Sequence, residues 1–154
     1  MKRPAAFVST WAFALMVSLL PAFWPTLSAA QSSPLLVQNA WVRKAPGTDT
    51  AAAYFVLKNT SAEAVTVVGV SSPVASHVMI HETSTVDGQS RMRMHEKLVI
   101  APGKSVAFEP GGLHMMLSGF TANVAVGQTV PLTLILADGA HVQAAAVVRP
   151  LDAQ

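Results

Sequence analysis

The sequence has 154 residues, no cysteine, and ten basic against eight acidic side chains. Without cysteine there is no thiol nucleophile and no thiolate metal site, so imidazole, thioether or oxygen must hold any metal. Lys2 and Arg3 account for the positive excess, and the 124 residues that follow position 30 carry balanced charges. This part of the chain therefore lacks the excess of positive charge that would attract nucleic acid or an acidic membrane.

Residues 1–30 have the pattern of a secretory signal peptide. The positive start leads into an uncharged run from Ala5 to Trp24, and Ser28-Ala29-Ala30 places small residues where a signal peptidase cuts. An uncleaved membrane anchor is the alternative, because the apolar run is just long enough to span a bilayer. Two prolines near its end and the small-residue exit favour cleavage. We therefore expect one domain over residues 31–154, located in the bacterial periplasm.

Beyond this leader the chain consists of short segments typical of strands, separated by turn residues. About nine segments show apolar alternation or an apolar run of strand length. They are residues 37–44, 51–59, 64–72, 75–82, 90–95, 105–109, 113–117, 130–136 and 141–148. Residues 119–128 are expected to form a loop, and no helical period follows the leader. The sequence predicts an all-β domain, a β-sandwich or small barrel of mostly antiparallel strands.

The turns between these segments have specific chemistry. Asp87-Gly88 and Asp138-Gly139 are typical of two-residue hairpin turns, which need positive φ. Pro102-Gly103 and Pro110-Gly111 fit type II turns, in which proline sets φ and glycine takes the left-handed position. We expect tight reversals at all four places.

Histidine and methionine recur at a particular spacing. Ten residues separate His81 from Met92, twenty-one separate Met92 from His114, and one separates His114 from Met116. Residues two apart in a strand point to the same side, so His114 and Met116 present an imidazole and a thioether together. The Asp87-Gly88 hairpin can bring His81 and Met92 onto one face. Because thioether sulfur selects Cu(I) and binds hard cations poorly, the set predicts a site that carries copper.

This spacing, His-x10-Met-x21-His-x-Met, resembles the signature of the periplasmic copper chaperones called PCuAC. The segments AWVRKAPGTDTAAAYFVLKN, RMRMH, PGGLHMMLSGF and VPLTLIL are also similar to that family. The resemblance covers essentially all of residues 31–154. It implies a cupredoxin-like β-sandwich that binds one Cu(I) per chain through His81, Met92, His114 and Met116. Some relatives have a Met- and His-rich tail with a second copper site, and the ending VVRPLDAQ lacks one.

The resemblance also implies a function and partners. A PCuAC protein delivers copper toward the CuA centre of cytochrome c oxidase, so the expected acceptor is subunit II of that oxidase or a Sco-type protein. The expected chain is a monomer that binds neither nucleic acid nor, as a mature domain, a membrane.

The hairpin register leaves a second methionine as an alternative ligand. A strict two-residue turn pairs His81 with Met94 and Met92 with Thr83, which makes Met92 a diagonal neighbour of His81. The family spacing selects Met92, and Met94 is kept as a supporting or substitute thioether. His77 and Met79 share the face of His81, and His77 is expected to be structural. The residues placed outside the site are His95 on the opposite face, His141 in solvent, and Met115 and Trp41 in the core.

Three functions remain open on the sequence alone. The first is a copper carrier, and the second is a copper buffer or scavenger without a dedicated acceptor. The third, of a different class, is a β-sandwich assembly or adhesion domain that binds no metal. An enzyme is not expected, because the chain shows no Ser/His/Asp spacing, no paired carboxylates on one strand, no phosphate-binding loop and no cofactor motif.

Overall fold

The computed structural model describes residues 33–152, in which all the regular elements are strands. They are β1 (Leu35–Lys44), β2 (Thr50–Asn59), β3 (Val65–Ser71), β4 (Ala75–Val86), β5 (Gln89–His95), β6 (Leu98–Ile100), β7 (Ser105–Phe108), β8 (Leu113–Phe120), β9 (Thr129–Leu136) and β10 (His141–Arg149). No helix in this part of the chain is long and apolar enough to cross a membrane. The predicted signal peptide lies outside the described residues.

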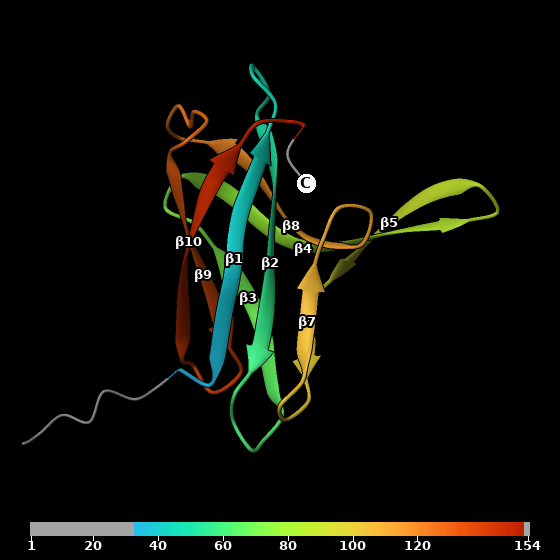
Figure 1. The fold of residues 1–154 in the computed structure, drawn as a ribbon, viewed down its shortest axis with the longest axis vertical. Helices are drawn as coiled ribbons and strands as arrows, with labels where there is room; N and C mark the ends of the chain where they lie inside the picture. The colour runs from blue at the N-terminus through green and yellow to red at the C-terminus, as the bar shows by residue number, and fades with distance from the viewer. Residues whose placement is uncertain (1–32, 153–154) are drawn as a thin grey trace, which may run out of the picture. The chain divides into compact units, whose positions relative to one another are not determined.

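The strands form one hydrogen-bonded sheet that folds over a common core (Figure 1). Its order is β5-β4-β8-β2-β1-β10-β9-β3-β6, with β7 paired to β2. Every pairing is antiparallel except that of β1 with β10. β3 and β4, which follow one another in the chain, also contact each other, although they are not neighbours in the hydrogen-bonded order. The prediction of an all-β sandwich of mostly antiparallel strands is confirmed.

The core is built from one face of each central strand, as period-two alternation requires. Side chains that are at most 1% exposed include Val42, Leu57, Met115, Leu117, Val130, Leu132 and Leu134. On β8 the alternation buries Met115 and Leu117 and leaves His114 and Met116 on the outer face. The prediction that Met115 packs in the core is confirmed.

Three details differ from the sequence-based expectations. β6 was missed because three residues are too few to show alternation. β8 runs to Phe120, where a loop was expected, because Gly119 with φ +68° lets the pairing with β4 continue as far as Ala75. The prediction of a two-residue turn at Asp138-Gly139 is also wrong. The N–H of Leu136 donates to Ala140 O, so the pair that closes the turn encloses three residues, 137–139, and Asp138 is not at positive φ.

The other predicted turns are present, and one of them fixes the register of the site. Asp87 and Gly88 both have positive φ, 52° and 74°, as a type I′ hairpin requires. This turn places Met94 opposite His81 and Met92 opposite Thr83, so the predicted register is confirmed. The β4–β5 hairpin extends beyond the other strands in Figure 1 and forms one edge of the sheet.

Candidate metal centre

The centre of the site is a pair of histidines on neighbouring strands. His81 of β4 and His114 of β8 face each other in register, with ring centroids 5.9 Å apart and ring planes perpendicular. His114 is only 8% exposed. Because Ile80 and Met115, beside them in the chain, are buried in the core, the sheet backbone sets the separation of the two imidazoles.

A backbone carbonyl orients the His114 ring. Its Nδ1 lies 3.1 Å from Gly112 O, and since a carbonyl only accepts, the neutral ring donates from Nδ1 and keeps the lone pair on Nε2. Gly112 O also accepts from the N–H of Thr83 at 3.0 Å, which ties β4 to the turn before β8. That turn closes with Gly112 N–H donating to Glu109 O, and Gly111 has φ +84°, as predicted for Pro110-Gly111. A metal-binding histidine is commonly held in this way.

The His81 ring has an unsatisfied nitrogen. Its Nδ1 is buried and has no hydrogen-bond partner among residues 33–152. Leaving a buried polar atom unpaired costs about 1–3 kcal/mol, so such an atom needs an explanation. A metal ion bound between the two imidazoles would supply the missing partner.

Burial lowers the pKa of the His81 imidazole below its ordinary value, and the adjacent His114 lowers it further. Folding therefore favours the neutral ring. The stability that this preference contributes is complete above about pH 6.5, the ordinary histidine pKa, and is lost as pH falls through the lower pKa of the folded state.

We expect the metal-free protein to lose part of its thermal stability through His81 on acidification. Between pH 7.5 and 5 the melting temperature of His81→Gln should fall less than that of the parent. Thermal unfolding at both pH values measures this, and His141→Gln, which changes an exposed histidine, should behave as the parent does. Equal falls in the parent and His81→Gln would contradict the expectation.

The methionines lie on the same outer face as the two imidazoles. Met116 is next to His114 on that face of β8 and is partly buried. Met94 is the direct neighbour of His81 on β5, and Met92 is the diagonal one. Both hairpin methionines are well exposed, Met92 by 58% and Met94 by 51%. The structure thus brings together His81, His114 and Met116 on two paired strands and places Met92 diagonally, on the projecting hairpin.

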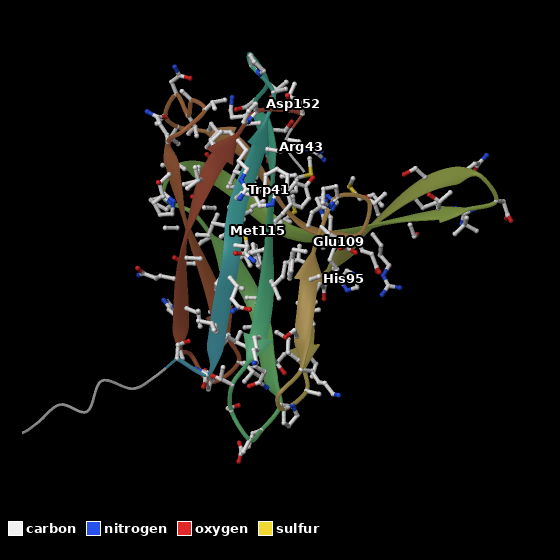
Figure 2. All side chains as sticks on the ribbon, viewed as in Figure 1. Trp41, Arg43, His95, Glu109, Met115 and Asp152 are labelled. Atoms are coloured by element: carbon white, nitrogen blue, oxygen red, sulfur yellow. The ribbon has the colours of Figure 1, made fainter. Side chains whose placement is uncertain are left out.

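The remaining histidines lie away from this group. His95, the last residue of β5, is labelled in Figure 2. It is on the opposite face, where its Nε2 lies 2.8 Å from a carboxylate oxygen of Glu82. His141 is exposed at the start of β10. His77 is exposed opposite Ser118, about 13 Å along the strand from His81. In the described part of the chain no three His, Cys, Asp or Glu side chains could hold a metal, so more than two ligands require thioethers.

Trp41 is buried as expected, but on the outer face rather than in the sandwich core. A bulge between Gln38 and Trp41, with Asn39 at φ 55°, points Val42 into the core and Trp41 outward. Its ring stacks on Tyr54 at a centroid distance of 4.6 Å and is covered by the Arg149 guanidinium at 5.1 Å.

A pair of arginines continues the row of residues that contains Met116. Met116 faces Ala52 on β2, Ala52 faces Arg43 on β1, and Arg43 faces Arg149 on β10. Arg43 donates to the Tyr54 hydroxyl at 2.7 Å, and neither guanidinium contacts a carboxylate of residues 33–152. Two fixed positive charges near the site repel a divalent ion more strongly than a monovalent one.

Comparisons with known proteins agree with this architecture. The family model described as "Putative lipoprotein LpqE-like" matches residues 35–148. The protein named "Putative lipoprotein Lxx21020" from Leifsonia xyli subsp. xyli is 37% identical over 110 residues, which are 71% of this chain and 66% of that protein. This chain thus spans just under two thirds of that relative's length.

Two solved structures share the fold. CuI-DR1885 from Deinococcus radiodurans has 35% identity and a TM-score of 0.61, over 79% of this chain and 83% of the other. The apo PmoF2 PCuAC domain has 22% identity and a TM-score of 0.66, over 79% and 94%. The predicted cupredoxin-like β-sandwich is confirmed. The chain belongs to the LpqE-like family, which is related to the PCuAC proteins that its His and Met spacing indicated.

Proposed function

We propose that this protein is an exported copper chaperone that binds one Cu(I) and passes it to an acceptor protein by ligand exchange. The ligands in this proposal are His81, Met92, His114 and Met116. The observation that carries it is the facing pair His81–His114, in which one buried ring nitrogen has no hydrogen-bond partner among the described residues and thioethers lie on the same face. The 35% identity with the CuI-DR1885 structure supports copper(I) as the cargo.

The donor set fits the chemistry of a cuprous ion. Two neutral imidazoles and two thioethers leave the ion its single positive charge, and thioether sulfur favours Cu(I) over Zn²⁺, Mg²⁺ or Ca²⁺. A closed-shell ion imposes little geometry, so one thioether can leave while the others stay. Such a site carries a metal and has no group placed for catalysis.

The surroundings of the site suit transfer to another protein. Met92 and Met94 are exposed on the projecting hairpin, where an acceptor's ligand can reach copper. Arg43 and Arg149, fixed on the same face, offer positive charge to an acidic rim on the acceptor. The acceptor that we propose is the CuA centre of cytochrome c oxidase, reached through subunit II or a Sco-type protein. The periplasm is the compartment that we propose for the transfer.

The proposal is tested by anaerobic titration of the purified protein with Cu(I) against a competing chelator. We expect one Cu(I) per chain, and no comparable binding of Zn²⁺. Mixing the loaded protein with an apo CuA domain should then move copper to that domain and develop the CuA absorption. A protein that binds no stoichiometric Cu(I) is not a chaperone. Tight binding without transfer to any CuA or Sco-type acceptor would identify a copper buffer.

The exposed hairpin provides a test of which thioether binds copper. Met92→Leu should weaken Cu(I) binding by about 10-fold or more, because the proposed set contains this sulfur and loss of an outer partner alone costs metal sites at least about 10-fold. Met94→Leu should change it less than 3-fold if Met94 only supports the site. The same chelator competition measures both variants, which are matched in chemistry and exposure. The reverse ranking would assign the ligand to Met94, the direct neighbour of His81.

A further inference from the structure

Besides Met94 on the hairpin, the face that carries the two histidines holds a second thioether outside the four-ligand set, that of Met79. Met79 lies two residues before His81 on β4, so both side chains point to the same side of the sheet. Its register partner on β8 is Met116. β4 and β8 therefore present two successive facing pairs, His81–His114 and Met79–Met116, which we call the β4–β8 ladder.

The dimensions of the ladder allow all four side chains to bind one ion. Same-face neighbours are about 6.7 Å apart along a strand, and the Cα atoms of facing residues are about 4.5–5.5 Å apart. Methionine has three rotatable bonds, so the Met79 sulfur can turn toward the point that the Met116 sulfur reaches. His77 is a further two residues along β4 and too far from His81 to share that ion.

Burial separates the ladder from the hairpin methionines. Met79 and Met116 are partly buried, and the residues next to them on the inner face, Ile80 and Met115, belong to the core. Met92 and Met94, in contrast, are more than half exposed on β5, the edge strand of the sheet. The ladder is thus held by core packing on two paired strands, whereas the hairpin thioethers are open to solvent and to another protein.

We propose that Met79 is a copper ligand that takes the place of the hairpin thioether during transfer. This inference rests on the proposed copper function. In the exchange the bond from copper to the Met92 sulfur breaks as a bond to the Met79 sulfur forms. Both donors are neutral, copper stays Cu(I), and no proton or electron moves. The ion remains bound to the β4–β8 ladder. The coordination position that the Met92 sulfur has left then becomes open to a ligand of the acceptor.

A variant without hairpin thioethers, Met92→Leu/Met94→Leu, isolates the ladder. Methionine and leucine are close in volume, and thermal unfolding checks that each variant folds. X-ray absorption of the Cu(I)-loaded protein counts the sulfur atoms bound to copper. We expect two sulfurs in the double variant, and one when Met79→Leu is added, with a further loss of affinity of about 10-fold. Adding Met115→Leu instead, which removes a core thioether from the other face of β8, should leave two.

The outcomes separate the inference from the function on which it rests. One sulfur in the Met92→Leu/Met94→Leu variant, or no copper bound to it, would show that Met79 does not ligate. The same follows if adding Met79→Leu changes neither the sulfur count nor the affinity. In each case Cu(I) binding by the parent protein would still support the chaperone. If the parent itself binds no Cu(I), the proposed function fails and the inference fails with it.

Discussion

Replacing His114 by alanine is expected to weaken Cu(I) binding on the order of 100-fold or more. The change removes an imidazole whose Nδ1–H donates a hydrogen bond to Gly112 O, which leaves the Nε2 lone pair free for a metal. It also leaves His81 without the ligand that faces it. Loss of an outer partner alone typically costs metal sites 10–100-fold, and a direct ligand should cost at least as much. Chelator competition under anaerobic conditions, where methionine is protected from sulfoxide formation, measures the change.

The matched control for this experiment is His95→Ala. His95 is partly buried, and its ring pairs with Glu82 on the other face of β4 and β5. Its removal should leave the copper affinity within about 3-fold of the parent, a difference below 1 kcal/mol. If His114→Ala folds and still binds as tightly as the parent, the metal centre is not between His81 and His114. His81→Ala supplies a second check, because it should weaken binding even where His114→Ala disturbs the fold.

Replacing Met115 by alanine is expected to lower the free energy of unfolding by about 2–5 kcal/mol. The preference of the site for Cu(I) over other metals should change little. Met115 is completely buried in the core cluster, so truncation leaves a cavity. Denaturant unfolding of the metal-free protein measures the loss. The size of the effect follows from packing, since no metal ligand is removed.

Met92→Ala is the counterpart of this variant. Met92 is 58% exposed and takes no part in the core, so its truncation should change the stability of the metal-free protein by less than about 0.5 kcal/mol. Its effect should appear in copper affinity instead. A large loss of stability in Met92→Ala, or a small one in Met115→Ala, would mean that the two faces of the sheet are assigned the wrong way round.

Local chemistry in the sequence was enough to predict most of the strands and one part of the site. Asp87-Gly88 tolerates positive φ at both positions, so the β4–β5 register, with Met94 opposite His81, followed from a turn of two residues. Alternation placed Met115 in the core and His114 and Met116 on the outer face. The bulge at Asn39 had no such signal, because a single residue in the left-handed region does not alter the pattern of the strand. The orientation of Trp41 was therefore missed.

The sequence by itself determined that the chain is an all-β protein with histidine and methionine at a spacing suited to one soft metal ion. Only the tertiary structure decided that His81 faces His114 and that Met79 faces Met116. β4 and β8 are separated along the chain by three other strands, and no turn links them, so their pairing and register depend on how the whole sheet packs. The physical reason is that a hairpin register is fixed by local φ and hydrogen bonding, whereas a long-range register is fixed by burying Ile80, Met115 and Leu117 in a common core.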